Sequence, residues 1–137
     1  GPDRLLTSDS AWSRFPVRAV REGGRIVELV HGPRWFRRPD SPSPRAPSAP
    51  ADWQAYPGHY RAQVPYDSNV RVVVRHGELL LLSPEGNEEK LVPGPGGIFR
   101  VGAEGRGVER VRFFDVVSGR ALRVELSGTS YYRADSP

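Results

Sequence analysis

The stretch YPGHYRAQVPY gathers the side chains of this sequence that are best suited to chemistry. His59 has the type of side chain that serves as a general base near neutral pH, Tyr60 can relay a proton, and Arg61 can clamp an anion. In an extended strand, however, Tyr56, Gly58 and Tyr60 face one side, and we interpret His59 and Arg61 as divided between the two faces. This alternation argues against a catalytic site and leaves His59 and Arg61 as polar candidates only.

A structural interpretation accounts for the same stretch more fully. Trp53 and Tyr56 are expected to pack the base of a barrel. Gly58 is expected to admit a neighbouring backbone or ring, and Tyr60 to be a core aromatic residue. The residues expected to carry the fold are Trp53, Tyr56, Gly58, Tyr60, Phe99, Phe113, Tyr131 and Tyr132.

Other polar residues give no stronger site. His31, His59 and His76 are far apart in the sequence, whereas a zinc site needs three or four converging ligands, so we expect no metal and no cofactor. Glu109 or Asp115 with Glu125 could form a pair of carboxylates, as in glycosidases.

These acids are more simply explained as partners of outward-facing arginines across the sheet. Asp115 is the one polar residue on an apolar strand face. If it is buried it needs a partner, for which Arg133 or a tyrosine hydroxyl would serve, and a strand end or a bulge at this position is the simpler explanation.

The elements that must position these residues are short antiparallel strands. In VRVVVRH the side chains of Val70, Val72 and Val74 share one face and those of Arg71 and Arg75 the other, which is typical of a half-buried strand. Further strands are expected at 78–82, near Leu91, and at 98–101, 109–117, 120–126 and 130–133, with turns at His76-Gly77, Glu85-Gly86-Asn87, 94–97, 102–107, Ser118-Gly119 and 127–129.

The last strands repeat this alternation. Val111, Phe113 and Val117 are predicted to share one face, and Leu122, Val124 and Leu126 are predicted to point inward. Regularly spaced strands without any sustained helical period predict an all-β fold, a small antiparallel up-and-down, lipocalin-like barrel of about eight strands preceded by a β-hairpin arm.

Composition divides the chain into parts. Residues 1–2 are interpreted as a protease scar left from expression, residues 3–38 as the arm, residues 39–52 as a proline-rich linker and residues 53–137 as the barrel.

The arm resembles the end of the barrel, with Gly32 on Gly128 and Arg37 on Arg133, which favours either a repeat or simply two similar hairpins. A detached hairpin is barely stable, so we expect the arm to pack its apolar side chains on the barrel or on a second chain in a homo-oligomer; these are Phe15, Val17, Val27, Leu29 and Trp35.

Composition also bounds the function. The 137 residues include no methionine, which indicates a fragment or a processed piece, and no cysteine, which excludes disulfides and thiolate chemistry. Arginines are spread along the chain rather than clustered, so we expect no nucleic-acid partner despite the net charge of +4. No apolar run is long enough for a membrane helix, so a soluble protein without a membrane partner is expected, and the localisation is left open.

The barrel segment resembles a known family. The patterns W-x-x-Y-P-G-x-Y-R from Trp53, HGELLLL from His76, L-x-P-x-x-x-x-x-F-R-V from Leu91 and the closing V-x-F and YYR are similar to the C-terminal lipocalin-like β-barrel domain of bacterial serine hydrolases related to class C β-lactamases, penicillin-binding proteins and D-aminopeptidases. The resemblance covers residues 53–133 and implies a barrel that follows a catalytic domain.

The catalytic motifs of that family are absent from this sequence. Its Ser-x-x-Lys nucleophile needs a serine three residues before a lysine, but the only lysine is Lys90, and Asn87 stands at that position. The resemblance therefore implies no catalytic residue here. It implies a non-catalytic accessory barrel that packs on the catalytic domain of the parent hydrolase and shapes substrate access or oligomer contacts. The alternative is a lipocalin-like barrel that binds a small hydrophobic ligand, although Phe99, Phe113 and Tyr60 are bulky enough to fill a small barrel.

Overall fold

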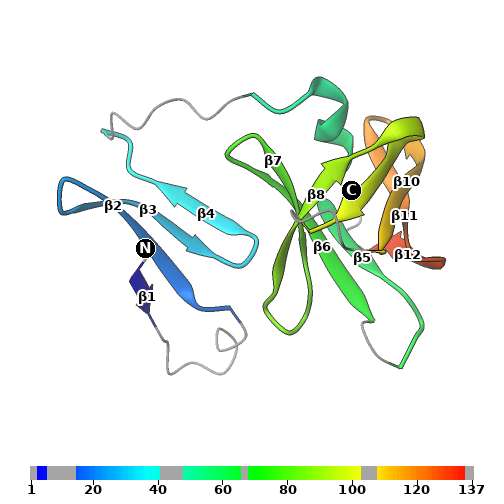
Figure 1. Cartoon of the computed structure of the whole chain (residues 1–137), viewed down its shortest axis with the longest axis horizontal. Helices are drawn as coiled ribbons and strands as arrows, with labels where there is room; N and C mark the ends of the chain where they lie inside the picture. Colours follow the sequence, from blue (N-terminus) through cyan, green and yellow to red (C-terminus); the bar gives the residue numbers. More distant parts are fainter. Residues whose placement is uncertain (1–2, 6–14, 41–47, 66–67, 103–107, 135–137) are drawn as a thin grey trace. The chain divides into compact units, whose positions relative to one another are not determined.

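A computed structural model describes residues 3–5, 15–40, 48–65, 68–102 and 108–134 (Figure 1). The chain divides into two compact units, Gly1–Ala46 and Pro47–Pro137, and each is described by itself. Both units are built from antiparallel strands, as the alternating sequence patterns predict.

The first unit is a small antiparallel sheet. Its strands are β1 (Asp3–Leu5), β2 (Val17–Glu22), β3 (Arg25–His31) and β4 (Arg34–Arg37), and they lie in the order β1-β2-β3-β4. The arm is thus more than the predicted hairpin, because β4 completes a three-stranded meander with β2 and β3 and the short β1 pairs with β2.

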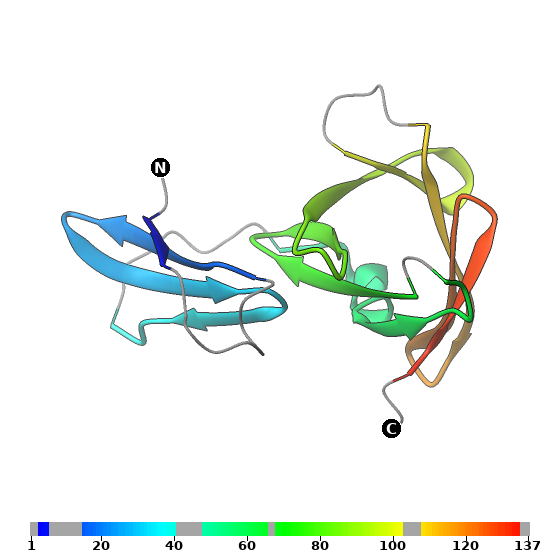
Figure 2. The same ribbon diagram turned by 90° about the horizontal axis from the view of Figure 1, so that it is seen from below.

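The second unit is a closed eight-stranded barrel, as predicted. Its elements are η1 (Ala51–Ala55), β5 (Gly58–Arg61), β6 (Asn69–Arg75), β7 (Glu78–Leu82), β8 (Glu88–Pro93), η2 (Pro95–Gly97), β9 (Ile98–Val101), β10 (Arg110–Val117), β11 (Arg120–Leu126) and β12 (Thr129–Arg133). Each strand pairs with the next along the chain, and β12 closes the ring by pairing with β5 (Figure 2). Closure gives every strand a neighbour on each side.

Tight turns connect several of these strands where the sequence predicts them. At His76-Gly77, Ser118-Gly119 and Ser127-Gly128 both residues have positive φ, between 48° and 89°. Two-residue turns with positive φ at both positions match the twist of the flanking strands. The predicted turn at 102–107 lies largely outside the described residues.

The barrel interior is packed with apolar side chains. Its buried core consists of Tyr60, Val70, Val72, Leu79, Leu81, Leu91, Phe99, Val101, Val111, Val124 and Tyr131. Trp53, Tyr56, Phe113 and Leu126 are partly buried and pack against this core. The predicted packing roles of Trp53, Tyr56 and Tyr60 agree with this arrangement.

The inward face of the last hairpin differs from the prediction. Val117 was expected to share a face with Val111, and Leu122 to point inward, but Val117 and Leu122 are 54% and 41% exposed, whereas Val111 and Ala121 are fully buried. The change occurs at Asp115, which follows the paired residue Phe114 and has a left-handed backbone with φ of 57°. A left-handed residue interrupts the strict alternation of a strand. Beyond this point the side chains that face inward are therefore not those that the alternation predicts.

Two further expectations about the barrel strands were wrong. Arg75 was expected on an exposed face, but it is buried, and its Nη1 lies 3.1 Å from Oε1 of Glu88. The strand predicted from the first tyrosine begins only at Gly58, because Trp53 lies within η1 and Tyr56 caps that turn in a helical conformation.

Candidate functional site

The side chains of Arg133 and Tyr60 connect the last and first strands of the barrel, β12 and β5. We call these two side chains and their hydrogen bonds the clasp. Arg133, at the end of β12, pairs with Tyr60 of β5 in the ladder that closes the ring. The two side chains meet inside the barrel, where Arg133 Nη2 donates to the Tyr60 hydroxyl at 2.9 Å and the guanidinium lies 5.0 Å from the centre of the Tyr60 ring.

The guanidinium of Arg133 also binds backbone carbonyls from three places in the chain. Its Nε donates to the carbonyl of Ala121 at 2.7 Å, and its two terminal nitrogens donate to the carbonyls of Pro57 and Ala55 at 3.0 and 3.3 Å. The Tyr60 hydroxyl donates in turn to the carbonyl of Tyr56 at 2.7 Å. The planar fork of an arginine suits this task because it holds several donors in fixed directions.

Gly58 makes room for the clasp. A Cβ atom placed on Gly58 would overlap the guanidinium of Arg133. Gly58 was expected to admit a neighbouring backbone or ring. It does leave space for a neighbour, but that neighbour is the charged side chain of Arg133. Sequence reasoning did not assign the clasp to Arg133, and the only signal for it was a glycine two residues before a core tyrosine.

Aromatic rings pack beside the clasp. Tyr56 stacks on Phe113 with ring centres 4.1 Å apart, and Phe99 contacts Trp53, Tyr56 and Phe113 edge-on at 5.8–5.9 Å. Burial raises the pKa of the Tyr56 hydroxyl above its usual value, and the nearby carboxylate of Asp52 raises it further. This part of the barrel is therefore occupied by packed rings.

The polar candidates His59 and Arg61 lie on the outer face of the barrel. They are two residues apart in β5 and so share a face, which corrects the expectation that they would be divided between both faces. His59 Nε2 lies 3.2 Å from Oδ1 of Asn69 on the neighbouring strand. Tyr60 points inward between them, so the three side chains do not converge.

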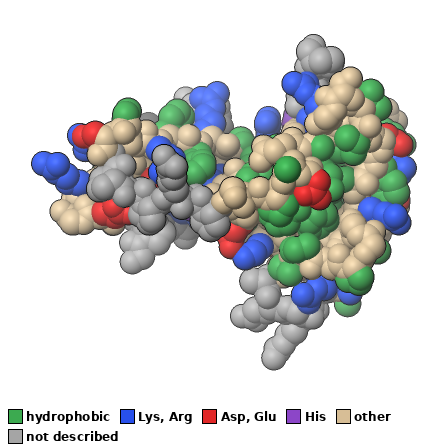
Figure 3. Space-filling view, turned by 90° about the horizontal axis from the view of Figure 1, so that it is seen from above, with side chains coloured by type: hydrophobic (Ala, Val, Ile, Leu, Met, Phe, Trp, Pro, Cys, Tyr) green, Lys and Arg blue, Asp and Glu red, His purple; other side chains and the backbone are tan. Residues whose placement is uncertain are grey.

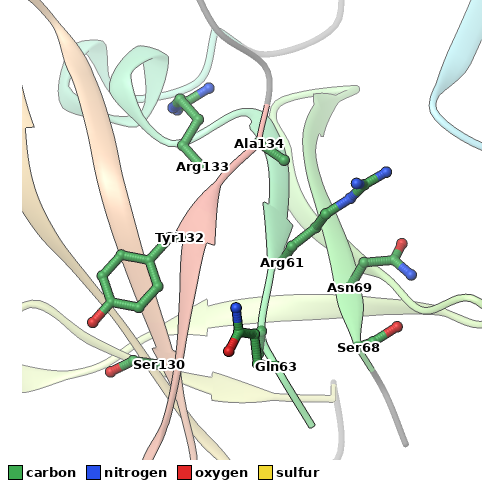
Figure 4. Close-up of a pocket in the computed structure, with 9 residues that line it drawn as sticks. Arg61, Gln63, Ser68, Asn69, Ser130, Tyr132, Arg133 and Ala134 are labelled. Carbon is green, nitrogen blue, oxygen red and sulfur yellow. The ribbon is translucent and has the colours of Figure 1, made fainter. Parts of the chain in front are cut away.

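A groove of about 730 Å³ lies beside Arg61 on the outside of the barrel. Tyr132, opposite Arg61 in the ladder, is 61% exposed and borders the same groove. Figure 4 shows Arg61 and Tyr132 beside the groove, whereas the side chain of Arg133 extends away from it toward η1. The groove is lined by Arg61, Ala62, Gln63, Ser68, Asn69, Ser130, Tyr132, Arg133 and Ala134.

Asp115 is an outer-face residue and not a buried carboxylate. Its side chain is 57% exposed, and its Oδ2 lies 3.2 Å from Nε of Arg123. Glu125 lies 3.9 Å from the same guanidinium. Asp115 is thus the partner of an arginine on the neighbouring strand, as the simpler interpretation of its pattern predicts, whereas Glu125 lies two residues from Arg123 on the same strand.

Large apolar side chains are exposed at the β10–β11 hairpin. Val116 and Val117 are 55% and 54% exposed, and Leu122 is 41% exposed. On the face of the molecule in Figure 3, hydrophobic side chains gather over the barrel and Lys and Arg are scattered around them. An apolar group left in water by an otherwise packed barrel is typical of an interaction surface.

Comparison with protein families, with curated proteins and with solved structures gave no match to this chain. The family resemblance is therefore supported only to the level of fold, a closed eight-stranded antiparallel barrel preceded by a small sheet. In the part of the chain that the structure describes, no three His, Asp or Glu side chains come together as metal ligands. No helix among the described residues has the length and apolar character needed to span a membrane.

Proposed function

We propose that this chain provides a non-catalytic accessory barrel of a β-lactamase-related serine hydrolase, one that packs on the catalytic domain and shapes substrate access or oligomer contacts. The observation that carries the proposal is the exposed apolar hairpin of Val116, Val117 and Leu122 on a barrel whose interior is packed. A packed interior leaves binding to the outer surface, and exposed aliphatic side chains favour a protein partner.

The sequence supports the hydrolase as the partner. The W-x-x-Y-P-G-x-Y-R pattern and the spacing of the later strands are similar to the accessory barrels of that family. The clasp gives these residues structural tasks, since Gly58 accommodates Arg133 and Tyr60 binds it. A motif that serves packing fits an accessory domain better than an enzyme.

The test compares the full-length protein containing this chain with a version that lacks residues 53–137. Hydrolysis of a β-lactam, a short-chain ester and a D-amino-acid amide is measured for both, with circular dichroism to check that the catalytic domain stays folded. We expect removal of the barrel to change kcat/KM or the order of preference among the three substrates. Unchanged kinetics, or a full-length protein without a hydrolase domain, would refute the proposal.

A second variant tests the hairpin directly. Replacing Val116, Val117 and Leu122 together by serine should reproduce the effect of removing the barrel, because the proposed contact is apolar. The matched control replaces Val73, Leu80 and Val92, which are partly buried on other strands of the barrel, by serine. An effect of the control equal to that of the hairpin variant would remove the assignment of the contact to the hairpin.

The ligand-carrier alternative has its own outcome in these experiments. Tyr60 and Phe99 occupy the interior together with the stacked rings of Tyr56 and Phe113. A fatty acid or a retinoid that bound the chain with micromolar affinity and shifted the NMR signals of these rings would favour the carrier over the accessory barrel.

A further inference from the structure

The seam that closes the barrel is short. The ladder between β12 and β5 contains two residue pairs, Tyr132 with Arg61 and Arg133 with Tyr60. The neighbouring ladder between β11 and β12 contains four pairs. Beyond Arg61 and Tyr132 the segments that follow β5 and precede Tyr132 diverge and leave an opening between them. Figure 4 shows Gln63 and Ser130 on its two sides. The groove beside Arg61 occupies this opening.

The geometry of β12 directs backbone groups into the opening. The two-residue turn Ser127-Gly128 makes Leu126 and Thr129 the closing pair of a hairpin, so Thr129 directs its backbone groups toward β11 and Ser130 directs its own away from β11. The same alternation places Tyr132 in the ladder with Arg61 and lets the amide of Ala134 donate to the carbonyl of His59 at 2.7 Å. The position opposite Ser130 would be Gln63, and the ladder does not extend to it.

The outer side chains at the opening favour a negatively charged ligand. Arg61 is exposed and makes no ion pair with any residue that the structure describes. The other side chains of the groove are neutral apart from Arg133, whose nitrogens bind the inner clasp. Arg61 is thus the charge available to a ligand in the groove, and Tyr132, which also lines the groove, is its ladder partner.

We propose that the opening at the β5–β12 seam binds a short extended peptide that carries a carboxylate. The peptide backbone would pair with the free edge at Ser130, in the manner of strand addition to a sheet. A carboxylate of the peptide would bind the guanidinium of Arg61, which can hold it with two parallel hydrogen bonds. The inference rests on the proposed function in one respect, since it takes the peptide to be a segment of the hydrolase domain.

A nucleic acid fits this surface less well. The next arginine along the outer row is Arg123, and its charge is offset by Asp115 and Glu125. Single-stranded nucleic acids are bound by grooves in which positive charges follow the backbone over several nucleotides. One available guanidinium beside the groove matches one carboxylate better than a row of phosphates.

The experiment uses the whole chain, labelled with ¹⁵N, and a six-residue peptide of alternating threonine and glutamate. A peptide of alternating threonine and glutamine, free glutamate and an eight-residue oligo-dT are the comparison probes. We expect the glutamate peptide to bind at least tenfold more tightly than the glutamine peptide in fluorescence anisotropy. The largest amide shifts in NMR spectra should be those of Ser130, Gln63 and Arg61.

Two variants test whether the positive charge of Arg61 is required for binding. Arg61→Gln should weaken binding of the glutamate peptide at least tenfold and leave the spectrum of the free protein otherwise unchanged, because this side chain is exposed. The matched control is Arg120→Gln, which removes an exposed arginine in the β10–β11 hairpin and should leave the affinity within twofold.

Four outcomes would overturn the inference. They are no binding of the glutamate peptide, equal binding of free glutamate and the peptide, tighter binding of oligo-dT than of the peptide, and amide shifts confined to residues away from the seam. Because these measurements need no hydrolase domain, peptide binding can succeed while the barrel-deletion experiment fails, and the reverse. The peptide-binding proposal and the accessory-barrel proposal can therefore be refuted independently.

Discussion

The guanidinium of Arg133 occupies the space that a side chain at position 58 would need, so Gly58 and Arg133 are complementary across the seam of the barrel. The charged group lies over the ring of Tyr60 and donates to carbonyls of residues before β5 and in β11. One side chain thus connects the first and last strands of the barrel to the turn of η1 that precedes them. We expect closure of the barrel to depend on this arrangement, because the ladder at the seam contains only two residue pairs.

Gly58→Ala should destabilise the barrel. The added methyl group displaces the guanidinium and breaks hydrogen bonds to partly buried carbonyls, for which we expect a loss of about 2–3 kcal/mol in the free energy of unfolding. Urea unfolding followed by circular dichroism measures this change. In the Arg133→Met background the same substitution should cost much less, because the clash is gone, and equal costs in both backgrounds would contradict the complementarity.

Arg133→Lys should not preserve the clasp. A lysine carries the same charge, but its three donors on one nitrogen cannot reach the separate acceptors Ala121, Pro57 and Tyr60 at once. We expect a loss of about 2–3 kcal/mol in the free energy of unfolding. The control Arg120→Lys, at the exposed first residue of β11, should change stability by less than about 0.5 kcal/mol. A stable Arg133→Lys variant would mean that charge alone holds the seam.

A β-branched residue at position 115 should destabilise the barrel. Asp115 has φ of 57°, a left-handed conformation that aspartate and asparagine tolerate and valine does not. Asp115→Val should therefore lose about 1–2 kcal/mol of stability. Asp115→Asn should lose less than about 1 kcal/mol, since it gives up only an exposed ion pair with Arg123. Equal thermal stability of the two variants would show that the backbone at this position is not held in the left-handed conformation.

The sequence predicted the fold well because its signals are local. Alternation at Val70, Arg71 and Val72 and turns such as Ser118-Gly119 depend on neighbouring residues only, and both are present in the structure. Alternation failed at Leu122, since a left-handed residue on the facing strand changes which side chains point inward, and nothing in the local pattern marks Asp115 as left-handed.

The candidate sites were less predictable because they depend on contacts between distant parts of the chain. Arg133 meets residues 73 to 78 positions earlier in the sequence, and such a meeting follows only from closure of the barrel. The groove beside Arg61 likewise depends on where the ladder of the seam stops. Arg61 was named as a candidate by residue type alone, and its neighbours across the groove could not be inferred from spacing.

Alkaline pH should weaken the barrel through Tyr56. Its pKa is raised in the folded protein, first by burial and then by the carboxylate of Asp52, so the folded state holds the hydroxyl proton more tightly than the unfolded state. Stability from this group is fully present below the unfolded pKa of about 10 and is lost as the pH rises through the higher folded pKa.

Tyr56→Phe tests this dependence while keeping the ring that stacks on Phe113 at 4.1 Å. At pH 8 the variant and the original protein should have nearly equal free energies of unfolding, because the hydroxyl is protonated in both states. Above pH 10 the original protein should lose stability more steeply than the variant, and urea unfolding at a series of pH values measures the difference. Tyr132→Phe is the matched control for removal of a tyrosine hydroxyl, since that ring is exposed. Parallel curves for Tyr56→Phe and the original protein would mean that burial of the Tyr56 hydroxyl does not contribute to the alkaline loss of stability.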